Sequence, residues 1–219
     1  MRQYKAIIFD FDMTLADTSR VIYTLLAKCV NEFGYTVKSL EDVYCVIGNT
    51  HEIMLSHISG ETDPARLLEM RTRYRQLCRD EMAALTEFFP DAPACIANIS
   101  GKGIKVGLLS LKLRDVLMQS LVKYDLAQYF QVVTGCDDVP APKPDPSGLI
   151  NTIKGLDVPA KDVLYVGDSL VDQDAAFSAG IDFAAMLRGS TTREQFDADR
   201  VKHFYFTADE LWRDVASLD

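Results

Sequence analysis

The stretch Ala6-Ile7-Ile8-Phe9-Asp10-Phe11-Asp12-Met13-Thr14 decides how this chain folds. Its first four residues form an apolar run, which is typical of a buried strand in a parallel sheet. Side chains alternate between the faces of a strand, so Asp10 and Asp12 project together from its carboxyl end, where open α/β sheets bind ligands. Two carboxylates held close together repel unless a cation or a proton lies between them. The pair therefore indicates a metal site, an acid/base pair or both, and the simpler alternative is a solvated strand end.

The composition limits the class of protein. The chain has 219 residues, of which 48% are hydrophobic and 25% charged, and this is enough for one large domain or a core carrying a smaller one. The formal net charge of −9 argues against nucleic acid and against an anionic membrane surface as partners. The five cysteines show no metal-ligand spacing, and no signal peptide or membrane-spanning run is found. We therefore expect a cytoplasmic protein with reduced cysteines.

Strand and helix patterns alternate over the C-terminal part of the chain. Strand signals occur at 104–110, 131–134, 163–166, 183–187 and 203–206, with helical patterns at 114–122, 145–153 and 173–179. This alternation is typical of βαβ units. It predicts a Rossmann-like α/β core with a mainly parallel sheet flanked by helices.

A long helical stretch interrupts this pattern after Thr14. A crossover between parallel strands needs only a dozen or more residues, so residues 16–85 are too many for one. We expect helices from about 18 to 34, from 39 towards 48, over 50–58, and from 63 to 85. The predicted domains are a catalytic core of residues 1–15 and 86–219 and an inserted α-helical domain of residues 16–85.

Two further strands lead into residues that suit an anionic ligand. Ser110 ends the strand at 104–109, and its hydroxyl and backbone N–H can both donate to a phosphate oxygen. Lys143 follows the strand near 131–135 within Ala141-Pro142-Lys143-Pro144-Asp145-Pro146, where prolines on both sides stiffen the backbone. Each segment taken alone also fits an ordinary polar turn.

The strand at 163–167 ends in Asp168. This carboxylate is placed to complete a hard-oxygen site with Asp10 and Asp12, which suits Mg²⁺. Asp172 can orient Lys143 or a metal-bound water. Both Asp172 and the nearby Asp174 also fit carboxylates favoured at a helix N-terminus, and that explanation suffices for Asp174.

Together and in this order, these elements resemble the haloacid dehalogenase superfamily of phosphotransfer enzymes. The matching segments are Asp10-Phe11-Asp12-Met13-Thr14, Ser110, Lys143, and Gly167-Asp168 with Asp172. The resemblance covers nearly the whole chain. The helical insertion looks like the small helical cap of that family, and the sequence is most similar to phosphoglycolate phosphatase-like members.

This resemblance implies roles for the matched residues. Asp10 is the nucleophile that forms an aspartyl-phosphate, and Asp12 is the general acid and base. Mg²⁺ is held by Asp10, the backbone carbonyl of Asp12, and Asp168, with Asp172 behind them. The groups implied for phosphate binding are Lys143, Thr14, Ser110 and the backbone N–H groups near Phe11 and Leu111.

Several positions distinguish members of the superfamily. Met13 stands where glycine is frequent, and Leu111 stands where asparagine is common. The related sugar-phosphate mutases usually carry His at Ile22, Arg at His51 and Glu at Gly167. These three differences favour a hydrolase.

The cap is expected to choose the substrate. The candidate residues there are Arg20, Gly48, Asn49 and His51. For His51 a surface position at a helix start is the slightly favoured interpretation over a ligand contact. Arg71, Arg73, Arg75 and Arg79 fit the solvated face of a long helix.

The expected substrate is a small phosphorylated metabolite, such as a phosphoglycolate-like monoester, because a helical cap leaves little room for a phosphoprotein. The alternatives that stay open are a sugar-phosphate mutase, a pyrophosphate or nucleotide phosphatase, and a non-catalytic phosphate-binding regulator. A regulator would not require both Asp10 and Asp12. The chain is expected to be a monomer or a homodimer.

Overall fold

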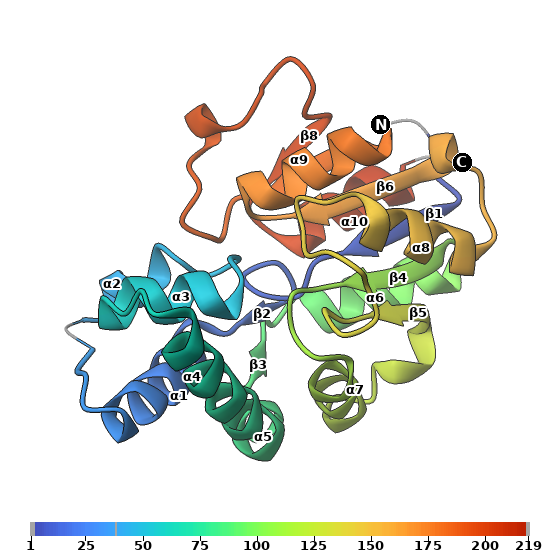
Figure 1. The fold of residues 1–219 in the computed structure, drawn as a ribbon. Helices are drawn as coiled ribbons and strands as arrows, with labels where there is room; N and C mark the ends of the chain where they lie inside the picture. Colours follow the sequence, from blue (N-terminus) through green and yellow to red (C-terminus); the bar gives the residue numbers. More distant parts are fainter. Residues whose placement is uncertain (1–2, 38, 218–219) are drawn as a thin grey trace.

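A computed structural model describes residues 3–37 and 39–217 of the chain. Over these residues, six parallel strands form a central sheet in the order β5-β4-β1-β6-β7-β8 (Figure 1). The strands are β1(Ala6–Phe9), β4(Lys105–Leu109), β5(Phe130–Thr134), β6(Val163–Gly167), β7(Asp182–Met186) and β8(His203–Tyr205). The sheet confirms the predicted α/β class.

Helices cover both faces of this sheet. Ile7 and Phe9 of β1 belong to an apolar cluster that includes residues of α6(Ala92–Gly101), α7(Arg114–Lys123) and α10(Ala208–Ala216). Ala6 and Ile8 belong to the opposite cluster, with α8(Ser147–Leu156) and α9(Leu170–Ala179). Because both faces are buried, β1 is apolar at every position rather than at alternate ones. Short 3₁₀ helices cover Ala127–Tyr129, Ala160–Asp162 and Arg193–Gln195.

A group of helices lies between the two short strands β2(Ala16–Asp17) and β3(Glu87–Phe88), which pair antiparallel. The helices are α1(Ser19–Glu32), α2(Leu40–Tyr44), α3(His51–Ser59), α4(Pro64–Leu77), a π-helical turn over Cys78–Met82, and α5(Ala83–Leu85). We call residues 19–85 the helical insertion. It gathers to one side of the sheet (Figure 1) and buries its own apolar cluster, which Leu113 and Val116 of the core also join.

The predicted helices differ from the observed ones mainly at their ends. The second ends at Tyr44 rather than near 48, although Ser39 caps it as expected by accepting from the backbone N–H of Asp42. The helix predicted over 63–85 contains the π-helical turn, which its apolar spacing does not reveal. The helix predicted to begin at 173 begins at Leu170, because Ser169 and Asp172 form a reciprocal capping box.

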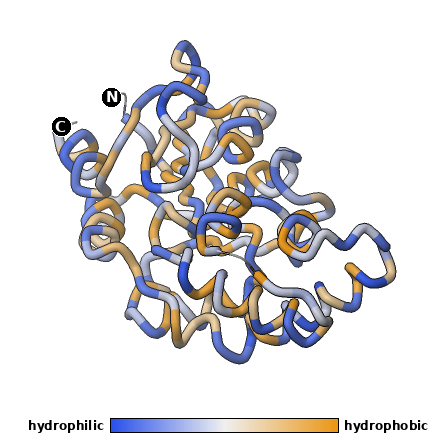
Figure 2. Tube along the Cα trace, turned by 90° about the vertical axis from the view of Figure 1, so that its left-hand side faces the viewer, coloured by the Kyte–Doolittle hydropathy of each residue, from blue (hydrophilic) through white to orange (hydrophobic). Residues whose placement is uncertain are grey.

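Polarity follows the same arrangement. Figure 2 shows hydrophilic residues predominating in the peripheral loops, with hydrophobic residues recurring along the inner elements. No described helix has the length and apolar character that crossing a membrane requires.

Candidate active site

The candidate site lies where three neighbouring strands end. β1 pairs in parallel with β4 on one side and with β6 on the other, so their carboxyl ends meet at one edge of the sheet. Asp10 continues this pairing, since its backbone N–H donates to the Val166 carbonyl at 2.8 Å. The polar residues that follow the three strands are Asp10, Ser110 and Asp168.

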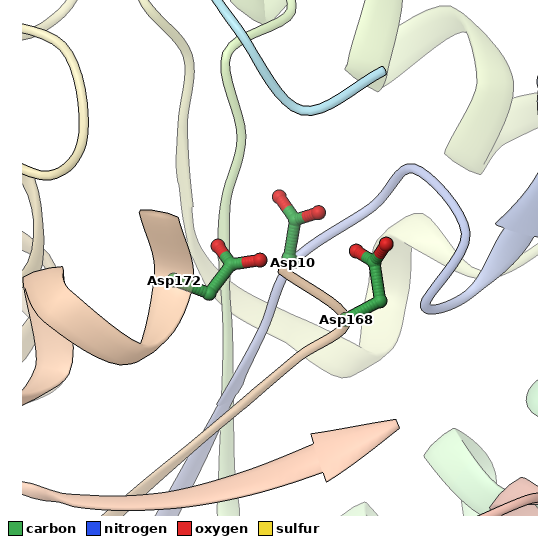
Figure 3. Close-up of side chains that lie close together, drawn as sticks. All are labelled: Asp10, Asp168 and Asp172. Carbon is green, nitrogen blue, oxygen red and sulfur yellow. The ribbon is translucent and has the colours of Figure 1, made fainter. Parts of the chain in front are cut away.

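Three buried carboxylates cluster at this edge. Asp10, Asp168 and Asp172 each place an oxygen within 4.8 Å of the others (Figure 3). Burial, with repulsion from Asp172 and Asp12, raises the pKa of Asp10 to about 7 against the opposing effect of Lys143. Burial also raises the pKa of Asp168 well above its usual value, and repulsion from Asp172 and Asp10 adds to the shift. The site therefore holds more negative charge than its own residues neutralise.

Lys143 is the cation at the centre of the cluster. Its buried Nζ donates to Asp10 Oδ1 at 2.8 Å, to Asp172 Oδ1 at 2.5 Å and to the Tyr165 hydroxyl at 3.1 Å. Burial acts to lower the pKa of Lys143, but Asp10 and Asp172 outweigh it and raise the pKa above its usual value. A permanently charged ammonium is thus fixed against Asp10. Asp172 therefore contacts Lys143, which is one of the two groups that we expected it to orient.

The donor set fits a hard divalent cation. Asp172 already accepts hydrogen bonds at both oxygens, from Lys143 and Tyr165 at Oδ1 and from Ser169 at Oδ2. These bonds, with the charge of Lys143, outweigh burial and lower its pKa. Asp10 accepts only from Lys143 and Asp168 only from Thr14 among the side-chain hydrogen bonds of the described residues, and the pKa values of both stay raised. An ion such as Mg²⁺, which prefers carboxylate oxygens, would supply further positive charge.

Asp12 is held by two groups. Its Oδ1 accepts from the Thr18 hydroxyl at 2.5 Å and lies 2.7 Å from Nζ of Lys112. Thr18 occupies the N-cap position of α1 without making the side-chain capping bond, because its hydroxyl is used here. Our sequence reasoning missed Lys112. The available signal was its position two residues after Ser110, in the loop that follows β4.

The residues predicted to bind phosphate lie around the same edge, with one correction. Thr14 Oγ1 donates to Asp168 Oδ1 at 3.3 Å. The backbone N–H of Ser110 donates to the Thr134 carbonyl at 3.1 Å, so it is not free for phosphate as we expected. Its buried hydroxyl remains at the edge, where it accepts from the Lys112 N–H. The Phe11 ring packs edge-on against Phe88 in the core.

Met13 has a backbone conformation that glycine adopts more readily than methionine does. Its φ of 54° is in the left-handed region, which costs an L-residue with a side chain roughly 1–2 kcal/mol relative to glycine. The side chain is buried in the apolar cluster of the insertion. Met13 therefore links the loop that follows β1 to the insertion.

The insertion residues predicted to choose the substrate do not all reach the site. Gly48, Asn49 and His51 line a small cavity together with Asp12 and Lys112. Arg20 is exposed on α1 and is absent from the residues that line this cavity.

Two interpretations of insertion residues were wrong. His51 is buried rather than a surface residue, and its ring packs edge-on against Tyr74. Arg75 is half-buried and lines a cavity together with Arg71, whereas the sequence predicts a solvated helix face for both. Sequence spacing alone missed this because the core covers part of that face of α4.

A family model and several relatives match this chain. The model described as "Haloacid dehalogenase-like hydrolase" matches residues 7–186. A phosphoglycolate phosphatase from Cereibacter sphaeroides is 32% identical over 187 residues, covering 84% of this chain and 85% of its own. Pyrophosphatase PpaX from Bacillus cereus is 29% identical over 196 residues, covering 88% of this chain and 89% of its own.

Solved structures share the fold. A structure described as a haloacid dehalogenase-like hydrolase from Bacteroides fragilis superposes with a TM-score of 0.90 at 34% identity, covering 95% of this chain and all of that one. CbbY from Rhodobacter sphaeroides, in complex with phosphate, has a TM-score of 0.81 at 20% identity and covers 95% of this chain and 96% of its own. At that identity the second likeness supports the fold alone.

Proposed function

The chain belongs to the haloacid dehalogenase-like hydrolase family, and we propose that it is a magnesium-dependent phosphatase that hydrolyses a small phosphorylated metabolite. The observation that carries this proposal is the contact between Lys143 and Asp10 beside a second buried carboxylate, Asp168, whose pKa is raised. The Lys143 ammonium lies on one side of Asp10, and the cation site lies on the other. Positive charge from both would reduce the repulsion between Asp10 and an anionic phosphoryl group. The similarity to a phosphoglycolate phosphatase and to a pyrophosphatase also supports this proposal.

Asp10 is the proposed nucleophile. Its carboxylate attacks phosphorus, the bond from phosphorus to the leaving oxygen breaks, and an aspartyl-phosphate forms on Asp10. Lys143 holds the attacking oxygen in place and neutralises charge on the transferring group. Positioning and charge stabilisation supply most of the acceleration in phosphoryl transfer.

Asp12 is the proposed acid and base. It gives a proton to the leaving oxygen and later takes one from the water that hydrolyses the aspartyl-phosphate. Such proton transfer contributes about 10²–10⁴-fold. Thr18 and Lys112 fix its orientation before substrate enters.

Mg²⁺ would be held by Asp10, Asp168 and the backbone carbonyl of Asp12. When bound, it supplies positive charge to the phosphoryl oxygens. Asp172 keeps Lys143 in position through its hydrogen bond. Asp10 and Asp168 would therefore supply the carboxylate ligands of the ion. The hydroxyls of Thr14 and Ser110 and the backbone N–H groups near Phe11 and Leu111 complete the proposed phosphate site.

Magnesium binding is expected to stabilise the protein more at high pH than at low pH. Without metal, the raised pKa values of Asp10 and Asp168 lower the free energy of unfolding as pH rises from about 4 towards 7, because the unfolded aspartates ionise earlier. The ion offsets that repulsion, but at low pH it must first displace a proton. Thermal unfolding with and without Mg²⁺ should therefore show a larger shift at about pH 8 than at about pH 5. Equal shifts at both pH values, or an undiminished shift in Asp168→Asn, would contradict the assignment.

Gly189 is expected to be required for the metal site. A Cβ added there would lie 1.9 Å from Asp168 Oδ2, so Gly189→Ala displaces that carboxylate. We expect the Mg²⁺ concentration for half-maximal activity to rise by about 10–100-fold, as for other perturbed ligand supports. Gly101→Ala is the matched control, because its Cβ would meet no atom within 4 Å. Identical Mg²⁺ titrations for the two variants would rule out this role.

The helical insertion is proposed to act as a cap over the mouth of the site. The proposed cap domain is residues 16–85, which adds β2 and Thr18 to the insertion, and the proposed core is residues 1–15 and 86–219. Residues 1–2, 38 and 218–219 of these ranges lie outside the described residues. A cap of this kind excludes water during chemistry and admits small substrates. The proposed partner is thus a small metabolite, in a monomer or homodimer, rather than nucleic acid or membrane.

A phosphoglycolate-like monoester is the favoured substrate, and pyrophosphate is the second candidate because a relative of similar coverage is a pyrophosphatase. Phosphate release from a panel of small phosphoesters and pyrophosphate, with and without Mg²⁺, tests both. Turnover of a member of the panel only with Mg²⁺ supports the proposal. Failure to release phosphate from any of them would contradict it.

A further inference from the structure

A second cavity lies between the helical insertion and the core. Its volume is about 160 Å³, whereas one water needs only about 10–15 Å³ on a comparable measure. The side chains that matter here are His51, Glu52, Arg71 and Arg75 from the insertion and Leu111 and Pro142 from the core. Leu111 follows Ser110 and Pro142 precedes Lys143 in sequence. The core side of the cavity therefore adjoins two residues of the proposed phosphate site.

Arg75, which lines this cavity, has an unused hydrogen-bond donor. Its Nε is buried and has no hydrogen-bond partner among the residues that the structure describes. Its Nη2 reaches only the sulfur of Cys136, at 3.9 Å, and a thiol sulfur is a weak acceptor. A guanidinium keeps its charge in proteins, so a buried donor without an acceptor is costly unless a ligand provides one.

The neighbouring arginines differ from Arg75. Arg71 forms an ion pair with Glu52, so these two opposite charges of the cavity wall neutralise each other. Arg73 donates twice to Glu32, at 2.6 and 2.8 Å. Arg75 thus supplies the excess positive charge of the wall.

The pKa of His51 is consistent with this excess of positive charge. Burial lowers the pKa of His51 to about 4, and the charges of Arg75 and Lys112 act in the same direction. The imidazole is therefore neutral near pH 7 and leaves the cationic character to Arg75. α3 begins at His51, so the positive end of its helix dipole also faces this region.

We propose that Arg75 binds a second anionic group of the substrate, a carboxylate or a phosphate, while the scissile phosphoryl group lies against Asp10. This inference rests on the proposed function and narrows its substrate class to small phosphoesters or anhydrides with a second anion close to phosphorus. The planar fork of the guanidinium matches both kinds of oxyanion. Either group would give Nε the acceptor that it lacks.

The test compares non-hydrolysable ligands that carry one or two anionic groups. Methylphosphonate has one, phosphonoacetate adds a carboxylate, and methylenediphosphonate adds a second phosphonate. Binding to the wild type, Arg75→Gln and the matched control Arg73→Gln is measured by titration calorimetry with Mg²⁺ present. We expect the wild type to bind at least one two-anion ligand about 10–100-fold more tightly than methylphosphonate, as a charge-assisted hydrogen bond allows.

Arg75→Gln should lose that preference, with methylphosphonate affinity unchanged within about threefold, and Arg73→Gln should keep it. The preferred two-anion ligand identifies carboxylate or phosphate as the group bound. A wild type without the preference, or a preference that survives in Arg75→Gln, overturns the inference. Release of p-nitrophenol from its phosphate ester by the same wild-type preparation tests the proposed function separately, because the binding comparison does not depend on turnover.

Discussion

Replacing Asp10 with asparagine should reduce phosphatase turnover by more than about 10⁴-fold, because the amide cannot form the covalent intermediate. The loss should not come from unfolding. The pKa of Asp10 is raised to about 7 by its burial, so a neutral side chain of the same shape removes repulsion near neutral pH. Lys143 keeps Asp172 as its ion-pair partner. We therefore expect the metal-free variant to melt at the wild-type temperature or above.

The measurement is initial-rate release of phosphate at saturating Mg²⁺, together with thermal unfolding of the same samples. Asp174→Asn is the matched control, because Asp174 is an exposed aspartate on α9, whereas Asp10 is buried. The control should turn over at the wild-type rate. Asp10→Asn with wild-type turnover would refute the nucleophile assignment.

Replacing Asp12 with asparagine should reduce turnover of alkyl phosphates by about 10²–10⁴-fold. The reason is that an amide can neither donate a proton to the leaving alkoxide nor accept one from the attacking water. With p-nitrophenyl phosphate the first step should survive, since p-nitrophenolate leaves without a proton. Stopped-flow measurement should then show a burst of one p-nitrophenol per enzyme followed by slow release of phosphate.

Asp12→Asn also leaves Lys112 without its ion-pair partner. Burial of an unpaired ammonium is destabilising, so the melting temperature must be measured along with the rate. The double variant Asp12→Asn with Lys112→Met removes both charges and should restore stability without restoring turnover. Recovery of turnover in that double variant would show that Asp12 acts through charge balance instead of proton transfer.

Most of the core and its predicted site could be deduced from the sequence. Apolar runs such as Ala6–Phe9 are buried on both faces, so they carry a local signal for strands in a parallel sheet. Parallel pairing then brings the strand ends together, which is why Asp10, Lys143, Asp168 and Asp172 meet as expected. The periodic helices of the insertion were also predicted, apart from their ends and the π-helical turn.

What could not be predicted depends on contacts between distant segments. Lys112 is buried against Asp12, about a hundred residues away in the chain, and nothing local distinguishes it from a surface lysine. His51 and Arg75 lie where the insertion meets the core, so their burial depends on how these two parts pack. The Ser110 N–H joins the sheet ladder instead of remaining free because β5 extends as far as Thr134.

The most direct test of the central claim is to look for a phosphoryl group on Asp10. The Asp12→Asn variant is mixed with p-nitrophenyl phosphate and Mg²⁺, quenched with acid and digested with trypsin, which releases the peptide from Ala6 to Arg20. Mass spectrometry should find one hydroxylamine-labile phosphoryl group on that peptide, assigned by fragmentation to Asp10. A peptide that stays unmodified while p-nitrophenol is released, or a label on another residue, would contradict the mechanism.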